Sequence, residues 1–186
     1  MPVQIGAKAH PFTNPTGLLS DCHRRIEMFL GTLESVARVI DLAPTDDVRQ
    51  ALESALRYFH QAAPKHTADE EQSLFPRLRQ VANAEIAMAL FRLDELEGDH
   101  RRADALHADV ERLGVKYLSE GRLPVGEVTR FRDLVRELKG MYERHIRVED
   151  NIIFPLAARS LNESDKRAIA DEMAGRRQVK LVPLSV

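Results

Sequence analysis

Hydrophobic residues recur at three- and four-residue steps along four long stretches of the chain, with polar residues between them. This spacing gathers apolar side chains on one face of an α-helix. No segment stands out with the alternating pattern of a β-strand or the turn sequence of a hairpin. The pattern predicts an all-α fold, an antiparallel up-down four-helix bundle with short loops.

Turn and capping residues set the expected limits of these helices, which are about 16–40, 45–80, 83–119 and 127–159. Asn14 or Thr16 could cap the first helix, and Asn83 the third. Pro64 lies inside the second helix and should kink it. Gly98 and Gly114 lower the helix propensity of the third stretch.

A short fifth helix is predicted at 163–175, with Ser164 as its N-cap and Gly175 as its C-terminal stop. The chain then divides into an N-terminal arm at 1–15, the bundle at 16–160, and the short helix with a tail at 161–186. No role for the arm or the tail follows from their residues.

Composition narrows the class of protein. The chain has 186 residues, is 44% hydrophobic and carries a net charge of −2, which gives no reason to expect nucleic acid or an anionic membrane as a partner. A single cysteine, Cys22, excludes an internal disulfide. With no apolar run of about 20 residues and no signal-peptide pattern at the N-terminus, a cytoplasmic location is expected.

One twelve-residue pattern occurs twice, as KHTADEEQSLFP at 65–76 and as RHIRVEDNIIFP at 144–155. Each copy places a histidine four residues before a glutamate, on one helix face. The first and third helices carry a related pair in DCHRRIE and GDHRRAD, where a histidine precedes an acid by four residues. The four histidines are His23, His66, His100 and His145. The chain therefore reads as an internal duplication of a helix pair.

The four histidines also lie at matching distances from the predicted turns, to within about one helical turn, so they can form one layer across the bundle. A single inward histidine is usually an ordinary core residue. Four such polar pairs at one level, however, each need a partner when buried. A metal ion would supply that partner, and we interpret the layer as a metal site.

These motifs resemble the hemerythrin-like, HHE cation-binding family over about residues 16–159. The resemblance implies a four-helix bundle that holds two iron ions, bridged by carboxylates and by an oxo, hydroxo or water oxygen. Carried over by position, it implies that His23 and His66 bind one ion, that His100 and His145 bind the other, and that Glu70 and Glu149 bridge them.

The chain departs from the oxygen-carrying hemerythrins at two places. Those proteins have a second histidine on the third helix, where this chain has Leu96 and Asp104. Their fourth-helix acid would correspond to Asp150, whereas the internal repeat favours Glu149. Both departures weaken the case for reversible oxygen carriage.

Ligand type bears on the choice of metal. Imidazole and carboxylate donors suit iron first and manganese second, whereas structural zinc usually takes cysteine and histidine.

Other residues near the histidines have less specific expectations. Glu27, Asp104 and Tyr142 are candidates for extra ligands or for hydrogen bonds around the site, and a solvated or ordinary core role is an equal alternative. Hydrophobic walls are expected from Ile26, Phe75, Val148 and Phe154. Three histidines are not expected to be ligands: His10, His60 and His107. Three arginine pairs are expected on the solvated surface: Arg24–Arg25, Arg101–Arg102 and Arg176–Arg177.

The first functional hypothesis is a protein that binds, senses or scavenges a small oxidant, namely dioxygen, peroxide or nitric oxide. The alternatives are a diiron enzyme of the peroxidase or oxidase type and a protein that handles iron as cargo. Physiological ligand, redox state and oligomeric state do not follow from the sequence.

Overall fold

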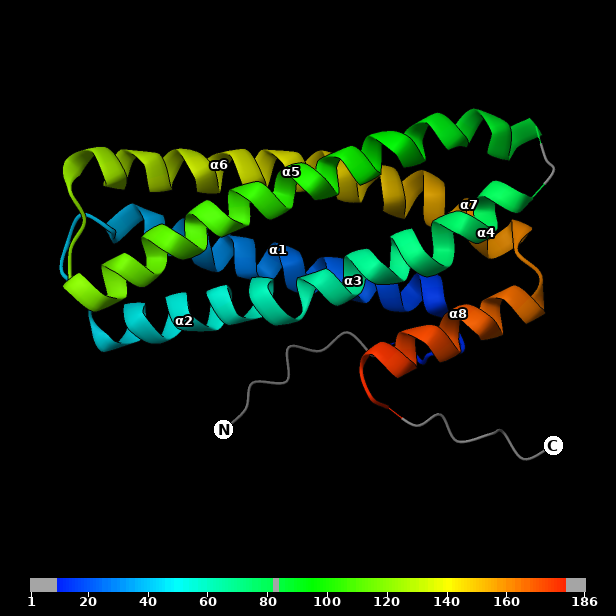
Figure 1. Ribbon diagram of the computed structural model, residues 1–186, viewed down its shortest axis with the longest axis horizontal. Coiled ribbons are helices and arrows are strands. Elements are labelled where there is room, and N and C mark those ends of the chain that lie inside the picture. The colour runs from blue at the N-terminus through cyan, green and yellow to red at the C-terminus, as the bar shows by residue number, and fades with distance from the viewer. Residues whose placement is uncertain (1–9, 82–83, 180–186) are drawn as a thin grey trace.

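The computed structural model describes residues 10–81 and 84–179, and all regular secondary structure within them is helical. Four long helical segments lie along one another, and each runs opposite to the one before it (Figure 1). The predicted all-α fold is confirmed. The segments are α1 Pro15–Val39; α2 Asp46–Gln61, α3 Ala63–Asp69, η1 Glu70–Leu74 and α4 Phe75–Gln80; α5 Ala84–Glu120; and α6 Val125–Val148, η2 Glu149–Ile153 and α7 Phe154–Ser160.

The caps agree only in part with expectation. The Asn14 side chain caps α1 by accepting the N–H of the residue three positions on, at 3.0 Å. The fifth helix, α8, spans Glu163–Arg176, but Asn162 caps it, so the prediction of Ser164 was wrong. The cap predicted at Asn83 lies outside the described residues. α5 runs without a break through both of its glycines.

The second long segment is interrupted immediately before its proline. α2 ends at Gln61 and α3 begins at Ala63, which leaves Pro64 in the first turn of α3. A proline is tolerated there because the first N–H groups of a helix have no partner within it. The predicted kink is therefore a break between two helices.

Two π-helical turns, which the sequence analysis did not predict, occupy matching places in the two repeats. In η1 the N–H of Phe75 donates to the carbonyl of Glu70, five residues back, and in η2 Phe154 does the same to Glu149. A proline follows each phenylalanine. Since proline lacks an N–H and its ring crowds the carbonyl four residues back, the wider turn removes this conflict.

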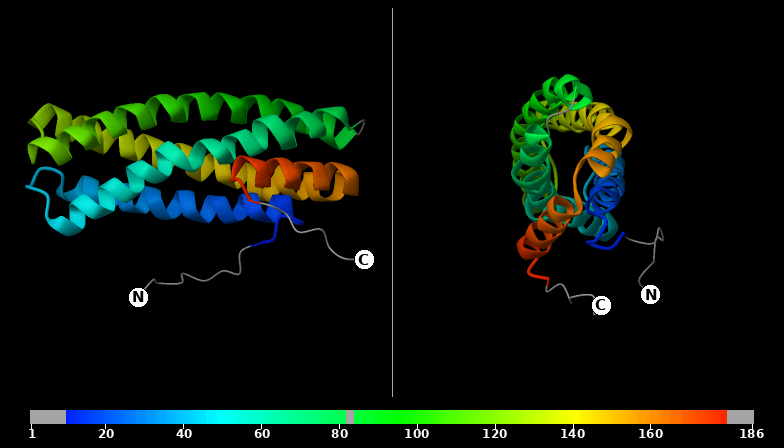
Figure 2. Two further views of the ribbon diagram at one scale, coloured as in Figure 1. Left: turned by 60° about the horizontal axis from the view of Figure 1, so that its bottom comes forward. Right: turned by 90° about the vertical axis from the view of Figure 1, so that its right-hand side faces the viewer.

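The apolar core forms two clusters along the bundle axis. One contains Ile26 and Phe131, and the other contains Leu19 and Phe75. On α1, His23 lies between Leu19 and Ile26, so a polar layer separates the two clusters. The end-on view shows the long segments around a common axis with α8 on the outside (Figure 2). α8 packs against α1, α3 and η1.

No helix in the described part of the chain is both long and apolar enough to span a lipid bilayer.

Candidate metal centre

Six buried side chains from all four long segments meet in the polar layer between the two apolar clusters. None of them is more than 6% exposed. They are the six residues predicted as ligands, and the structure brings all of them together: His23, His66, Glu70, His100, His145 and Glu149.

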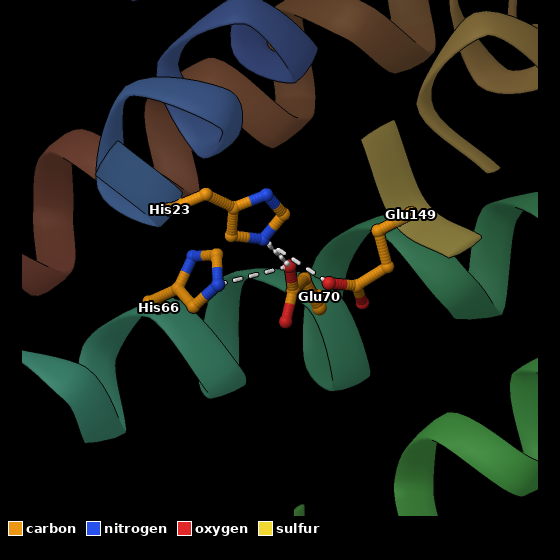
Figure 3. Close-up of side chains that lie close together, drawn as sticks. All are labelled: His23, His66, Glu70 and Glu149. Atoms are coloured by element: carbon orange, nitrogen blue, oxygen red, sulfur yellow. Dashed lines mark ion pairs between the residues drawn. The ribbon is translucent and has the colours of Figure 1, made fainter. Parts of the chain in front are cut away.

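One half of the cluster consists of His23, His66, Glu70 and Glu149 (Figure 3). His23 Nε2 lies 3.1 Å from Glu149 Oε2 and 3.8 Å from Glu70 Oε1. His66 Nε2 lies 3.2 Å from the same oxygen of Glu70. One nitrogen or oxygen atom from each of the four residues lies within 4.8 Å of the others, which is close enough for one cation to contact all four.

The other half consists of His100 and His145 with the same two glutamates. His145 Nε2 lies 3.1 Å from Glu149 Oε2, and His100 Nε2 lies 3.4 Å from Glu70 Oε2. The two Nε2 atoms are 3.1 Å apart. Glu70 therefore presents one carboxylate oxygen to each half, and Glu149 contacts a histidine in each.

The unpaired polar atoms of the cluster fit a metal centre. His23 Nε2 and all four carboxylate oxygens of Glu70 and Glu149 are buried and make no hydrogen bond with the described residues. His23 Nε2, both Glu70 oxygens and Glu149 Oε2 nevertheless lie at ion-pair distance from neighbours. Buried polar atoms without a hydrogen bond are costly. Atoms that converge in this way are suited to coordinate cations, and imidazole with carboxylate is a donor set typical of iron and manganese sites.

Comparison with known families agrees with this geometry. The profile of the hemerythrin HHE cation-binding domain matches residues 14–157. The chain belongs to this family. It is also similar to an uncharacterized protein of Haemophilus influenzae, with 29% identity over 173 residues that cover 91% of this chain and 93% of the relative. This relative supports the likeness and adds nothing on activity.

Both departures from the oxygen-carrying hemerythrins can now be placed. Leu96 is part of the apolar core and Asp104 is exposed, so neither replaces the second histidine of the third helix. On the fourth segment, Glu149 lies in the cluster, as the internal repeat predicted. Asp150 faces the far side of the His23 ring instead.

The second acid of each repeat holds a histidine of another helix. Asp150 Oδ1 lies 2.9 Å from His23 Nδ1, and Glu71 Oε1 lies 2.8 Å from His100 Nδ1. Such a contact fixes the orientation of a ligating imidazole and increases its basicity. In each repeat two acids follow one another, Glu70–Glu71 and Glu149–Asp150, and no role was predicted for the second of them. The duplication itself was the available signal.

The outer nitrogens of the other two histidines, His145 and His66, do not have matching carboxylate partners. His145 Nδ1 forms an ion pair with Asp99 Oδ2 at 3.5 Å, and neither it nor the buried His66 Nδ1 makes a hydrogen bond with the described residues. The two halves of the hemerythrin-like cluster therefore differ in their outer contacts, although their inner donor sets match.

Replacing an outer acid should weaken metal binding without abolishing it. We expect Glu71→Gln and Asp150→Asn each to lower metal affinity by about 10–100-fold, because the imidazole loses its orienting carboxylate. Competition with a chelator would measure the change. Glu27→Gln is the matched control: Glu27 lies one turn from His23 but is exposed and pairs with Arg24. An equal loss in the control would show that the outer contacts have no special role.

The phenylalanine of each repeat packs against a histidine in one half of the cluster. Phe154 stacks on His23 with ring centres 5.2 Å apart, and Phe75 lies parallel to His100 at 6.5 Å. Both phenylalanines are buried, as is Ile26, whereas Val148 is only partly buried. The positions of Phe75, Phe154 and Ile26 agree with the predicted walls, whereas Val148 packs against the second apolar cluster.

Two of the three additional candidates lie outside the cluster. Glu27 pairs with Arg24 at the surface, and Asp104 is exposed beside a cavity. Because an i,i+4 acid can share a helix face with a histidine and still point outward, spacing alone did not exclude them. Tyr142 is buried 6.2 Å from the His145 ring, but its hydroxyl lies 3.2 Å from His107 Nε2.

The histidines not expected to be ligands have other partners. His10 contacts Asp21, and His60 contacts Glu111 at the surface. Cys22 is buried outside both donor groups, and burial raises the pKa of its thiol, which disfavours the reactive thiolate.

Proposed function

We propose that the protein is a non-haem dinuclear iron protein that binds, senses or scavenges a small oxidant. One ion would be held by His23 and His66, the other by His100 and His145, with Glu70 and Glu149 shared between them. The observation that carries this proposal is that two four-residue donor groups have both glutamates in common. Shared carboxylates are what two neighbouring cations require, and a single ion would leave one pair of histidines without a partner.

The donor chemistry supports iron as the first choice and manganese as the second. Each group offers two imidazoles and two carboxylates and contains no cysteine, unlike a typical structural zinc site. Iron of this kind supplies redox chemistry and coordination positions for a small ligand. The protein's own residues would hold the ions, orient the imidazoles through Glu71 and Asp150, and exclude bulk water.

The size of the inner cavity supports a small ligand. The cavity is lined by all four histidines together with Ile26, Ala63, Thr67, Tyr142 and Ile146, and its volume is about 10 Å³. That is close to the space for one water-sized molecule. Dioxygen, peroxide and nitric oxide are within this range when small movements of the lining are allowed.

Metal analysis followed by reaction with oxidants tests the proposal. Aerobically purified protein should contain two iron ions per chain, one for each donor group. Mixing the reduced protein with dioxygen, peroxide or nitric oxide should then give a stable coloured adduct. Sustained turnover of peroxide with an electron donor would assign an enzyme instead. A single zinc ion per chain would overturn the dinuclear iron proposal.

Metal binding should also release protons. Burial lowers the pKa of His145, but Glu149 and Asp99 act against it and raise the pKa to about 10. The pKa values of His23 and His100 are raised in the same way by neighbouring carboxylates, despite burial. Burial lowers that of His66 to about 4. At neutral pH His145 therefore carries a proton that a cation must displace, and the pKa shifts of His23 and His100 act in the same direction.

We consequently expect metal affinity to fall as the pH is lowered, because protons and metal compete for the same nitrogens. Calorimetry in buffers of different ionisation enthalpy would count the protons released. His66 should contribute none. Proton release indistinguishable from zero at neutral pH would contradict the charge state inferred for His145.

A further inference from the structure

A second, larger cavity lies beside the metal centre, between α2–α3 and α5–α6. Its volume is about 180 Å³. Its walls are largely apolar, with Phe59, Ala103 and Val110 among them, and Asp104, Glu111 and His60 line it as well. The proposed binding of metal uses none of these six residues.

The two cavities meet at a shared wall. Ala63, Thr67 and Tyr142 line both the larger cavity and the small one at the histidines. The hydroxyl of Tyr142 lies 3.2 Å from His107 Nε2, and the His107 ring stacks on Phe59 with centres 4.2 Å apart. A hydrogen-bonded pair of side chains thus lies in the larger cavity at its junction with the metal centre.

We propose that the larger cavity is the route by which a small neutral ligand reaches the metal centre, and that Tyr142 and His107 form its inner gate. This inference rests on the proposed function, because it assigns an entry path to the same site. Rotation of the Tyr142 side chain would break its hydrogen bond to His107 and widen the junction beside Ala63. Side-chain rotation of this kind is fast compared with backbone rearrangement.

Charge along the route favours neutral molecules over anions. None of the described residues that line the larger cavity is Lys or Arg, while Asp104 and Glu111 are carboxylates. Burial lowers the pKa of His107 to about 4, so this ring adds no positive charge at neutral pH. Dioxygen, nitric oxide and hydrogen peroxide are neutral and would pass, whereas an anion such as azide would be repelled.

Another cavity provides the comparison. It lies between α1 and α2, has a volume of about 380 Å³ and includes Ala51 in its lining, but it shares no lining residue with the cavity at the histidines. Size alone therefore does not mark a cavity as a route. Lining residues shared with the cavity at the histidines do, and they distinguish Ala63 from Ala51.

The experiment compares Ala63→Leu and Thr67→Leu, which narrow the junction, with Ala51→Leu in the unconnected cavity. Stopped-flow mixing of metal-loaded protein with nitric oxide gives the association rate. We expect both junction variants to slow association by about tenfold or more, equivalent to about 1.4 kcal/mol in the barrier. The Ala51 variant should match the wild type in rate and in metal per chain, and the rates of all three variants are compared per bound metal.

Equal rates in both junction variants and the wild type would overturn the route, as would equal slowing by Ala51→Leu. The selection against anions is tested with the double variant Asp104→Asn, Glu111→Gln. It should speed the association of azide and leave that of nitric oxide unchanged. An equal effect on the two probes would overturn the selection for neutral ligands.

Xenon gives a readout that does not depend on the metal. In crystals under xenon pressure, the wild type should hold xenon in the larger cavity, because apolar cavities bind this gas, and Ala63→Leu should reduce the occupancy at the junction. If the protein contained no iron but bound xenon in the larger cavity, the proposed function would be rejected, while the cavity would be shown to accept small apolar molecules. Iron without xenon in the cavity would reject the route alone.

Discussion

Replacing Glu70 with alanine should reduce the metal content of the protein from the proposed two ions per chain to background, and Glu149→Ala should do the same. Each glutamate belongs to both donor groups, so one substitution removes a potential ligand from each group. It also leaves buried imidazoles without the carboxylates that balance their charge. Metal analysis after purification measures the loss, and circular dichroism checks that the helices remain.

The controls for this experiment lie within the same repeats. Glu71 is the neighbour of Glu70 but contacts only the outer nitrogen of His100, so Glu71→Ala should weaken binding and not eliminate it. His107→Ala should retain full metal content, because His107 lies outside both donor groups. If Glu70→Ala retained one ion, the carboxylate would not be shared. If Glu71→Ala lost as much metal as Glu70→Ala, the assignment of inner and outer acids would be wrong.

Most residues of the inner cluster could be predicted from the sequence, because the duplication determines both the spacing of the ligands along each helix and their level in the bundle. A histidine four residues before a glutamate determines a helix face, and its recurrence at matching distances from the turns determines a common level. Those two constraints suffice to bring His66, Glu70, His145 and Glu149 together. They say nothing of outward-pointing residues on the same stretches, which is why Glu27 and Asp104 were included among the candidates.

What the sequence did not reveal depends on contacts between distant segments. The π-helical turns have a local signal in the phenylalanine–proline pair that ends each repeat, but a proline can also end or kink a helix. The contact of Asp150 with His23 joins residues that are far apart in the chain, and no spacing rule specifies it. The contacts of the fifth helix also join residues far apart in the chain, and its arginines were expected to be solvated.

Arg176 and Arg177 are instead the partners of a buried carboxylate, so the expectation of a solvated pair was wrong. Asp69 is 0% exposed and immediately precedes Glu70. Its oxygens lie 2.8 Å from a guanidinium nitrogen of Arg176 and 2.6 Å from one of Arg177. Arg176 also donates to Ser73 Oγ at 2.9 Å. Two charges at the C-terminal end of α8, on Arg176 and Arg177, are therefore fixed against the turn that carries a predicted metal ligand.

The double variant Arg176→Ala, Arg177→Ala should lower the free energy of unfolding by about 3–5 kcal/mol, the usual cost of leaving a buried charge without its partner. Burial already raises the pKa of Asp69 against the opposing effect of the two arginines, so the carboxylate has little other compensation. Urea unfolding followed by circular dichroism gives the free energy. The matched control is Arg101→Ala, Arg102→Ala on the exposed face of α5, where a loss of about 1 kcal/mol or less is expected.

A third substitution separates the ion pair from simple loss of packing. Adding Asp69→Asn to the arginine double variant removes the charge that had lost its partners, so part of the stability should return. If the arginines contributed only through the packing of their side chains, Asp69→Asn would bring no recovery. Recovery in the triple variant would establish that α8 stabilises the bundle through a buried ion pair beside Glu70. Equal destabilisation by the Arg101–Arg102 control would remove the reason to single out this end of the chain.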